Sequence, residues 1–419
     1  MFRMAAHAKK PSEETDLLVL GDGPIAHSLS LALRATPLRI TIVDTFPQGR
    51  ERPASGERSL ALALSSLRLL QGLGVPLEDG SSGTIRSVRI SQQGGKSSVL
   101  LDHSLLGVPE ACLGKVFPLE SLARSLLHAI PESGIFLARK HWGAPERFSW
   151  FPDRIEAEWA GHRVAAKLLV VADGGNGRHG RLLGLRRLGW DHNRHAILAQ
   201  VGHGSPAGET AHEHFLESGP LALLPLAGSQ GYSVVWSLLP GEASTILGLS
   251  DAGFLRALNA RIPPGFPPLT KTGPRFSYPL HFQHFSSDPQ SRIIPLGNAA
   301  QTLHPLAGQG YNLGLRDAIT LAALLREAAL AGSDPGASAI LSDFQKIRLR
   351  DRWETIAFTE SMNRLFALGP LPFRWGRAIA LHALERTPRI KAALAGRLAG
   401  ISLPAASTIP DLRVASHVR

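Results

Sequence analysis

Cysteine is almost absent from this chain, which contains Cys112 alone among 419 residues. A single cysteine forms no disulfide within the chain, and it provides no cysteine-coordinated zinc site. Such usage is typical of a reducing compartment and favours the cytoplasm.

Long apolar runs are also missing, because no stretch of 18 or more apolar residues occurs. The longest uncharged stretch, residues 218–241, is interrupted by prolines and glycines, so it predicts two strands joined by a turn and not a membrane span. Residues 1–16 are charged and contain no apolar stretch of signal-peptide length, and we expect them to form a short disordered lead-in.

Acidic residues are the minority among the charged ones. The chain has 34 Asp and Glu against 45 Lys and Arg, a net charge of +11. The basic residues are spread along the chain instead of forming one dense block with aromatics, which argues against nucleic-acid binding. Attraction to an anionic membrane surface stays open. With 44% hydrophobic residues, the chain is expected to be globular, with two domains or one large domain carrying an insertion.

The chain does contain a strand–turn–helix–strand pattern near its start. Residues 16–20 (DLLVL) predict a strand, residues 24–34 a helix, and residues 39–43 a second strand that ends at Asp44. Between the first strand and the helix lies the sequence GDGPIA, which fits the G-x-G-x-x-G/A fingerprint of dinucleotide-binding proteins.

Each position of this fingerprint has a physical role. Gly21 allows the tight turn, Gly23 lets the backbone approach a pyrophosphate, and Ala26 permits close packing of helix on strand. Asp44 lies 21 residues after Gly23, where an acid can bind both ribose hydroxyls. The combination predicts dinucleotide binding, with a structural βαβ turn as the alternative.

Hydrophobic spacing predicts further elements along the chain. Helices are expected at residues 60–73 (with Gly74 as a C′ cap), 118–130 and 311–329, and from 338 onward. Strands or β-rich pieces are expected at residues 84–91, 167–171, 221–226, 232–238 and 292–296.

Two other segments end predicted strands with glycine. Residues 170–175 (VVADGG) form an apolar strand end followed by Asp173-Gly174, which read alone indicates only a turn. Residues 297–317 (GNAAQTLHPLAGQGYNLGLRD) hold four glycines and Pro305 before a long apolar helix. That composition predicts a backbone shaped to approach a ligand closely, with a helix N-terminus that favours negative charge.

In this order, GDGPIA, Asp44, Arg58, ADGG and GNAAQTLHPLAGQGYNLGLRD resemble the aromatic-ring flavoprotein hydroxylases. Within them the chain is most similar to the ubiquinone-biosynthesis hydroxylases, in their 2-polyprenyl-6-methoxyphenol branch. The resemblance covers nearly the whole chain and includes SLALALSSLRLLQGLGV, GPLALLPL and FQKIRLRDRWETIAFTESMNRLF. The segment at residues 297–317 is specific to this subfamily, while the first two motifs are shared by many flavoproteins.

The resemblance implies an α/β fold with a Rossmann-like FAD-binding domain, an inserted β-sheet substrate domain and a C-terminal helical region. The expected bounds are 14–185 and 286–332 for the two parts of the FAD-binding domain (with some substrate-domain strands near 82–112), 186–285 for the β-rich substrate domain, 333–403 for the helical region and 404–419 for a flexible tail.

The resemblance also implies roles for single residues. Gly21, Gly23 and Asp44 would hold the ADP half of FAD, and Arg58 would contact its pyrophosphate region. Asp173 would lie near the middle of the cofactor. The remaining cofactor-binding positions are Ala26 in the first helix, Gly297 and Asn298, the latter where many relatives have a ribitol-binding Asp, and the isoalloxazine-lining Pro305, Gly308, Gln309, Gly310, Tyr311 and Asn312.

The implied activity is that of an NAD(P)H- and O₂-dependent hydroxylase, in which FAD transfers one oxygen atom to a polyprenylated phenol. No second G-x-G-x-x-G follows a strand, so the reductant would have no domain of its own, as in this family. His304 and Pro305 are the catalytic candidates beside the flavin. His304 would transfer a proton or orient the ring, and a purely structural histidine is the alternative.

Two features depart from, or compete with, this interpretation. Gly177 and Gly180 stand where the family pattern D-G-x-x-S-x-x-R has Ser and Arg, which puts a reductant-binding role of that motif in doubt, although Arg178 and Arg181 lie nearby. The sequence His212-Glu213-His214 places both imidazoles on one face of a strand, but no third ligand is apparent, so we predict no metal site.

Partners and alternatives follow from the same resemblance. A polyprenyl substrate resides in a bilayer, so we expect the protein to lie on the inner face of a membrane. A ubiquinone-biosynthesis complex is an expected partner. Residues 372–403 mix apolar and basic side chains and predict either an interfacial segment or a solvated helical cap. The alternative functions are an FAD hydroxylase of a soluble phenol, another FAD oxidoreductase such as a prenyl-chain reductase, and a non-catalytic flavin-binding scaffold.

Overall fold

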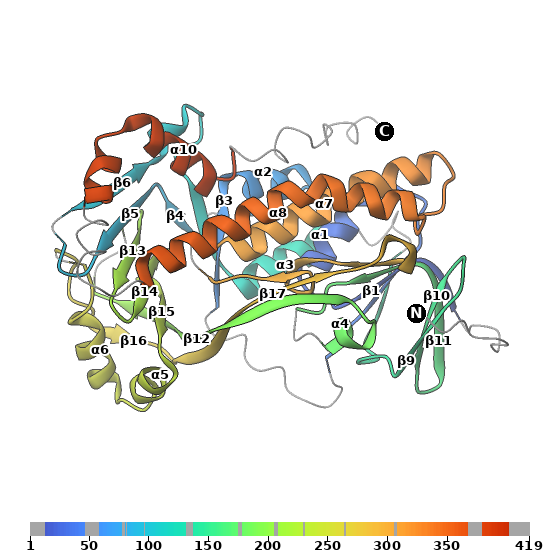
Figure 1. The fold of residues 1–419 in the computed structure, drawn as a ribbon, viewed down its shortest axis with the longest axis horizontal. Helices are drawn as coiled ribbons and strands as arrows, with labels where there is room; N and C mark the ends of the chain where they lie inside the picture. Colours follow the sequence, from blue (N-terminus) through green and yellow to red (C-terminus); the bar gives the residue numbers. More distant parts are fainter. Residues whose placement is uncertain are drawn as a thin grey trace.

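The computed structural model describes residues 13–46, 58–77, 80, 82–95, 97–130, 137–174, 178–204, 208–228, 231–263, 265–305, 308–367 and 379–401. Two large sheets are joined by helices that run along the length of the molecule (Figure 1). The predicted α/β fold class is confirmed.

The first sheet has seven strands in the order β8-β2-β1-β11-β10-β9, and β18 pairs with the end of β11. Five of them are parallel, whereas β10 and β9 are antiparallel to their neighbours. The bounds are β1 Glu13–Leu20, β2 Ile40–Val43, β8 Leu137–Lys140, β9 Arg147–Trp150, β10 Ile155–Trp159, β11 His162–Val171 and β18 Ile293–Pro295.

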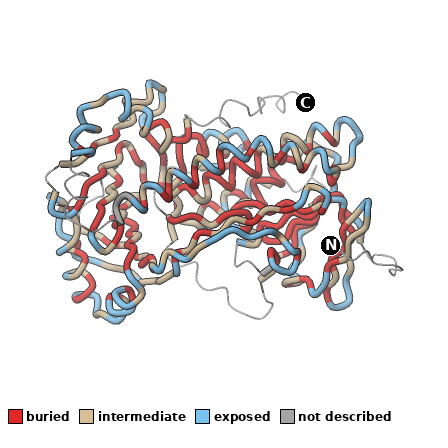
Figure 2. The backbone as a smooth tube through the Cα atoms, viewed as in Figure 1, coloured by how far each residue is buried: buried red, intermediate tan, exposed pale blue. Residues whose placement is uncertain are grey.

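Strand β1 shows why its sequence is a continuous apolar run. Leu17 and Val19 belong to the core under the helices, while Leu18 and Leu20 pack on the opposite face with Trp159 and its neighbours. A strand that is buried on both faces has no polar alternation, as is usual in parallel sheets covered on two sides. In Figure 2 much of the backbone of this sheet is buried, in the right-hand half of the view where Figure 1 labels β1 and β11.

Helices cover one face of this sheet. The longest, α8, extends beyond it toward the second sheet (Figure 1). None of the helices in the described ranges is both long and apolar enough to cross a membrane. The helices with printed bounds are α1 Pro24–Ala32, α2 Leu64–Gly72, α3 Leu119–Ala129, α4 Arg178–Leu182, α5 Pro240–Leu247, α6 Asp251–Asn259, α7 Gln309–Leu330, α8 Ser338–Ala367 and α10 Pro388–Leu398, with short 3-10 turns η2 His103–Leu106, η3 Pro289–Ser291 and η4 Gly297–Ala299.

The second sheet has nine strands in the order β19-β17-β12-β15-β14-β13-β5-β6, with β16 on β12. Strands β5 and β6 come from an earlier part of the chain and join through the parallel pair β13–β5. The bounds are β5 Ser87–Gln92, β6 Ser98–Asp102, β12 Arg186–Gly202, β13 Thr210–Leu216, β14 Gly219–Pro225, β15 Tyr232–Leu238, β16 Lys271–Thr272, β17 Phe276–Ser286 and β19 Gln301–Thr302.

The expected hairpin in residues 218–241 is confirmed, because β14 and β15 pair in antiparallel register. The sequence interpretation did not identify α5 and α6, which follow this hairpin directly. The domain bounds stay a prediction, and the tail 404–419 lies outside the described residues.

The helix predicted at residues 60–73 is wrong in its first part. Residues Ser59–Ala63 form strand β3, which pairs with β7 (Gly114–Pro118) in a small sheet that also contains β4 (Gly83–Ile85). Only the second part, α2, is helical, because pairing with a distant strand overrides the local helical spacing of LALALSSLRLL. The predicted C′ cap is confirmed, since Gly74 has φ +79° and its N–H donates to the carbonyl of Gln71.

Candidate functional site

Four of the predicted cofactor residues follow adjacent parallel strands. Gly21, Asp44, Asp173 and Gly297 come directly or within two residues after β1, β2, β11 and β18. The carboxyl ends of parallel strands meet at one edge of the sheet, so the fold brings these four positions together. Ligands of open α/β sheets bind at this edge.

The two fingerprint glycines have different surroundings. Gly21 has φ +112°, and a Cβ there would lie 2.3 Å from the carbonyl oxygen of Ala172, so no side chain fits between β1 and β11. A Cβ on Gly23 would meet nothing within 4 Å. Gly23 is the N-cap of α1, and that helix has no side-chain cap and no acidic residue in its first turn. Its terminal N–H groups can therefore face a phosphate across open space.

Asp44, at the end of β2, lies close to the carboxylate of Asp22, which already has basic partners. Asp22 accepts hydrogen bonds from Arg139 and contacts His27 Nε2 at 2.6 Å. Burial opposes ionisation of Asp22, but His27 and Arg139 hold its pKa well below the usual range. Asp22, Asp44 and His141 have potential metal-ligating atoms within 4.8 Å of one another, but Asp22 is committed to its two basic partners. Asp44 itself accepts a hydrogen bond from the Phe46 N–H, and its carboxylate lies 3.5 Å from His141 Nδ1.

Asp173 and Arg58 also contact other side chains. The Asp173 carboxylate lies 2.5 Å from Nδ1 of His179 in α4. The Arg58 guanidinium lies over the Tyr278 ring of β17, 4.0 Å from its centroid. This contact links the segment before β3 to the second sheet.

Of the two glycines that depart from the family pattern, only Gly180 belongs to the described residues. Gly177 lies outside the described residues. A Cβ on Gly180 would lie 3.0 Å from the Phe285 ring, so a long side chain there would displace that ring. Arg181 is exposed. The glycine at 180 therefore accompanies close packing of α4 on β17.

The start of α7 is fixed to β3 by one side chain. Asn312 accepts a hydrogen bond from the Ala63 N–H at 2.9 Å and donates to the carbonyls of Ala61 (2.9 Å) and Gly308 (2.8 Å). Gly308 is the N-cap with φ +61°, and a Cβ there would come within 2.8 Å of the Ala61 Cβ. Like α1, α7 lacks a side-chain cap and an acid in its first turn, so it can also receive negative charge.

The turn after β18 packs closely on the same helix. A Cβ on Gly314 would lie 2.8 Å from the Cα of Gly297, which itself has φ +57°. Asn298 is exposed, and a Cβ on Gly310 would lie 3.9 Å from its Oδ1. The polar amide of Asn298 thus remains accessible above the first turn of α7.

The other residues predicted around the flavin have mixed environments. Gln309 is buried, and Pro305 is half-buried. Tyr311 packs on the core under the helices, and burial raises the pKa of its hydroxyl. His304 is 2% exposed, with its ring 5.6 Å from that of His192 in edge-to-face contact. Burial lowers the pKa of His304 to about 3, so the imidazole is neutral at pH 7.

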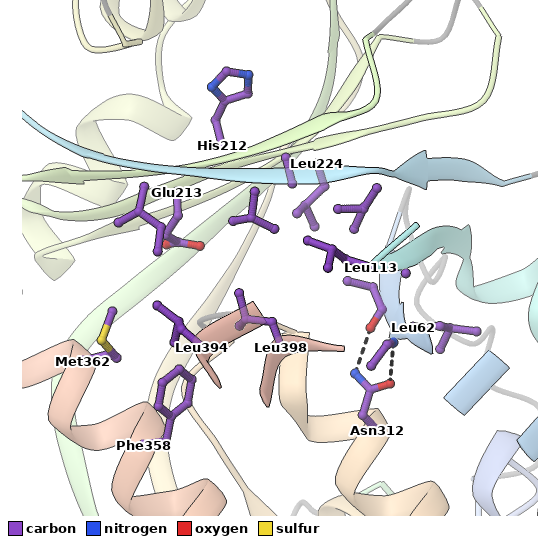
Figure 3. A pocket seen from close by; sticks show the side chains of 17 residues that line it. Leu62, Leu113, His212, Glu213, Leu224, Asn312, Phe358, Met362, Leu394 and Leu398 are labelled. Atoms are coloured by element: carbon purple, nitrogen blue, oxygen red, sulfur yellow. Dashed lines mark hydrogen bonds between the residues drawn. The ribbon is translucent and has the colours of Figure 1, made fainter. Parts of the chain in front are cut away.

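An apolar pocket adjoins the start of α7 (Figure 3). It has about 760 Å³ of empty space, part of it open to solvent. The second sheet provides one wall, α8 and α10 provide the opposite wall, and β3 with Asn312 closes the end next to the start of α7. Side chains that represent these walls are Ile90, Leu224, Phe358, Met362, Leu394 and Leu398.

A single acidic side chain lines this pocket. Glu213 of β13 points toward α8, whereas its neighbour His212 points away on the other face of the sheet (Figure 3). Burial raises the pKa of Glu213 to about 7. No hydrogen-bond or ion-pair partner of its carboxyl group occurs in the described part of the chain. The sequence interpretation considered Glu213 only as part of a His-Glu-His triplet, although strand alternation already separates it from both histidines.

Comparison with known proteins decides the family. The FAD binding domain family matches residues 14–359. Ubiquinone hydroxylase UbiL of Rhodospirillum rubrum is 31% identical over 387 residues, which cover 90% of this chain and 87% of that protein. The 3-demethoxyubiquinol 3-hydroxylase of Escherichia coli is 25% identical, with 91% and 97% covered.

The chain belongs to the FAD binding domain family. The predicted resemblance to the ubiquinone-biosynthesis FAD monooxygenases is confirmed. Among solved structures, p-nitrophenol 4-monooxygenase PnpA of Pseudomonas putida superposes with a TM-score of 0.75 at 16% identity and covers 94% of this chain and 99% of its own, which shows the shared fold.

FAD is therefore the cofactor of this flavin-dependent aromatic monooxygenase, and NAD(P)H is the reductant typical of the family. The described residues fit the cofactor. Two uncapped helix N-termini, α1 and α7, begin at the sheet edge, and a Cβ on Gly23 would project into open space. An extended dinucleotide with a pyrophosphate and an electron-rich ring edge suits such a site.

Proposed function

We propose that this monooxygenase adds one oxygen atom from O₂ to the aromatic ring of a polyprenylated phenol in ubiquinone biosynthesis. The observation that carries the proposal is the apolar pocket, which adjoins the start of α7 and contains one acidic side chain. A long isoprenoid tail needs apolar walls, and a phenol ring needs a few polar contacts. The names of the R. rubrum and E. coli relatives support the same pathway.

In this proposal the chain's residues bind and orient FAD, which takes electrons from NAD(P)H and activates O₂ when it is bound. Gly23 and the first turn of α1 contact the pyrophosphate, and Asp44 contacts the ribose. Asn298 faces the ribitol, and the first turn of α7 stabilises negative charge on the flavin ring. The other proposed cofactor contacts are Gly21, Ala26, Arg58, Asp173, Gly297, Pro305, Gly308, Gln309, Gly310, Tyr311 and Asn312.

We propose, as the sequence predicted, that His304 and Pro305 lie beside the flavin ring. Because the pKa of His304 is lowered to about 3, we assign it the role of a neutral group that orients the site, not of a cationic acid. The apolar walls exclude water from the reacting ring, which limits loss of the activated oxygen to side reactions.

We further propose that α10 lies against an anionic membrane surface. Leu394 and Leu398 of this helix line the pocket, and one turn earlier on the same stripe Ile390 is exposed (55%), next to the exposed Arg389. A basic and apolar helix suits a bilayer interface. Sedimentation with vesicles of anionic lipid should deplete the protein, and Ile390→Asp combined with Arg389→Glu should abolish this. Equal sedimentation of both proteins would refute the contact.

The pathway is tested by deletion of the gene in its host, with mass analysis of the prenylated intermediates. We expect accumulation of an intermediate that lacks one ring hydroxyl. Normal ubiquinone in a strain that lacks every paralogue would reject the proposal. Hydroxylation of a soluble phenol alone would favour the first alternative, and bound FAD without substrate-dependent O₂ consumption would favour a non-catalytic scaffold.

The cofactor contacts are tested by a matched pair of glycine variants. Gly23→Val should abolish FAD binding but leave folding intact, because its side chain enters open space. Gly21→Val should lower both, because its side chain meets the Ala172 backbone. Bound flavin measured by absorbance and unfolding followed by circular dichroism separate the two effects. Retention of flavin by Gly23→Val would contradict the proposed pyrophosphate contact.

A further inference from the structure

The pocket wall around Glu213 consists almost entirely of hydrocarbon. Phe358 and Met362 of α8 and Leu394 and Leu398 of α10 lie together on the wall opposite the strand that carries Glu213 (Figure 3). The other ionisable side chain of the lining, His212, points to the opposite face of the sheet and contacts aromatic rings there. The remaining polar side chain, Asn312, is fully used by β3 and Gly308.

We propose that the Glu213 carboxyl group forms a hydrogen bond with a hydroxyl group on the aromatic ring of the substrate and thereby sets which ring carbon faces the flavin. This inference rests on the proposed function, because it takes the pocket to be the substrate site. It assigns Glu213 a substrate-binding role that neither the fold nor the sequence motifs require.

The first argument is energetic. Placing a carboxyl group in apolar surroundings without a partner destabilises a folded protein, and burial with no opposing cation raises the pKa of Glu213 to about 7. A leucine would fill the same wall at less cost. A polar group that is retained at such a position is explained when a ligand provides its missing partner.

The second argument is geometric. Glu213 is paired in the sheet with Ala222 of β14 and Ile90 of β5, so its backbone is held by strands on both sides. A group on a rigid central strand positions a ligand more accurately than one on a loop. The remaining walls of the pocket are apolar and contact a ring and a tail without fixing rotation about their common axis. One hydrogen bond to a ring hydroxyl removes that freedom.

The third argument concerns reactivity. Attack on the ring by an electrophilic oxygen draws electron density from the phenolic oxygen, and its O–H becomes a stronger donor as the reaction proceeds. The ionised Glu213 accepts a hydrogen bond that strengthens in this way, and the neutral acid accepts a weaker one. The group is poised between these forms near neutral pH.

The experiment compares two probes on the FAD-loaded full chain. One is a short-chain 2-prenylphenol, and the other is its methyl ether, which cannot donate a hydrogen bond. Perturbation of the flavin absorbance gives the Kd of each probe. We expect the wild type to bind the phenol at least about tenfold more tightly than the ether, a preference that Glu213→Leu removes. Glu213→Gln should keep most of it, since an amide oxygen still accepts.

A second readout separates binding from a structural role. Glu213→Leu should raise the melting temperature while it removes the preference, because it deletes a half-buried carboxyl group that has no partner among the described residues. A residue needed only for packing or folding would lower the melting temperature. Met362→Leu, which changes the opposite wall without any hydrogen-bonding group, is the control and should alter binding of phenol and ether alike.

The outcomes distinguish this inference from the proposed function. If the wild type hydroxylates the phenol but Glu213→Leu keeps the phenol–ether preference and the same product isomer, the inference is overturned and the function stands. If the wild type binds the phenol through Glu213 without hydroxylating it, the function is overturned and the binding role stands. A mixture of ring isomers from Glu213→Leu, against one isomer from the wild type, would support both.

Discussion

Asp317 and Glu213 are both acidic side chains, the first fully buried and the second half-buried, and their surroundings are opposite. Asp317 in α7 is 0% exposed and accepts hydrogen bonds from Arg348, Arg352 and Gln301. Burial alone would raise the pKa of Asp317, but Arg352 and Arg348 lower it to about 2. No residue in the described ranges pairs with the Glu213 carboxyl group, and burial raises its pKa to about 7.

The difference indicates two different uses of buried charge. Asp317 belongs to an ionic cluster that joins α7 to α8, where Asp351 pairs with Arg316 and Arg348, and it also accepts a hydrogen bond from Gln301. A satisfied cluster specifies one packing of two helices. The Glu213 carboxyl group has no hydrogen-bond or ion-pair partner among the described residues, so it is available to a ligand. We infer that the paired carboxylate supports the scaffold and that the unpaired one serves the proposed substrate pocket.

The largest expected effect comes from breaking the cluster. Asp317→Asn leaves the buried guanidinium groups of Arg348 and Arg352 without their carboxylate, and should lower the free energy of unfolding by about 3–5 kcal/mol. Urea unfolding of the apoprotein measures this. A loss below about 1 kcal/mol would mean that the cluster does not hold α7 on α8.

The second prediction concerns the pH dependence of stability. The folded-state pKa of Glu213 is raised to about 7 from an ordinary 4.5, so the folded protein retains a proton that the unfolded chain loses. Its contribution is full below pH 4.5 and is lost as the pH rises through 7. The stability of the wild type relative to Glu213→Gln should therefore fall by up to about 3 kcal/mol over this range.

Subtracting the free energy of unfolding of Glu213→Gln from that of the wild type cancels the contribution of the histidines. Their lowered pKa values change stability with pH in the opposite direction. His284, for example, has its pKa lowered to about 4 by burial. Asp317 shows the reverse sign, with stability lost only as the pH falls from 3.8 toward 2. A flat difference for Glu213 between pH 5 and 8 would show that its carboxyl group is not isolated.

A third variant makes the pocket resemble the cluster. Met362→Lys places an ammonium group in the same pocket as Glu213. An opposite charge favours ionisation, so the pH at which the Glu213 contribution disappears should move down by about one unit. Met362→Leu is the control and should leave that pH unchanged. If Met362→Lys leaves that pH unchanged, the introduced ammonium group and the Glu213 carboxyl group are too far apart to interact.

The smallest effect is expected at the surface of α8. Asp343 pairs with Lys346 at 3.2 Å, and the two side chains are 56% and 72% exposed. Asp343→Asn should change the free energy of unfolding by about 0.5 kcal/mol or less. The same carboxylate-to-amide change at Asp317 and Asp343, measured by the same urea titration, isolates the effect of burial.

Sequence patterns predicted the parts of the fold that depend on local rules. The strand–turn–helix of GDGPIA, the hairpin in residues 218–241 and the long helix of α7 follow from periodicity and glycine placement. Residues 60–63 were predicted as helix because their strand partner, β7, lies more than 50 residues away. Local spacing carries no information about such a partner.

The site was predicted less completely for a similar reason. The glycines that approach a ligand are visible as a motif, but Asn312 was expected only to line the flavin, and its bonds to Ala61 and Ala63 depend on a contact between distant segments. The ionic cluster joins α7 to α8. From the sequence alone, its charged residues would be expected on the solvent-exposed faces of these helices. Glu213 was identified only with its two histidine neighbours, because isolation of a charge is a property of the folded pocket.

The most direct test of the account uses the purified, FAD-loaded protein with NAD(P)H, ¹⁸O₂ and a short-chain 2-prenylphenol. The account predicts one ¹⁸O atom on a single ring carbon of the product, with reductant and O₂ consumed only when the phenol is present. A protein that binds FAD but returns the phenol unchanged, or that inserts oxygen from water, would contradict it.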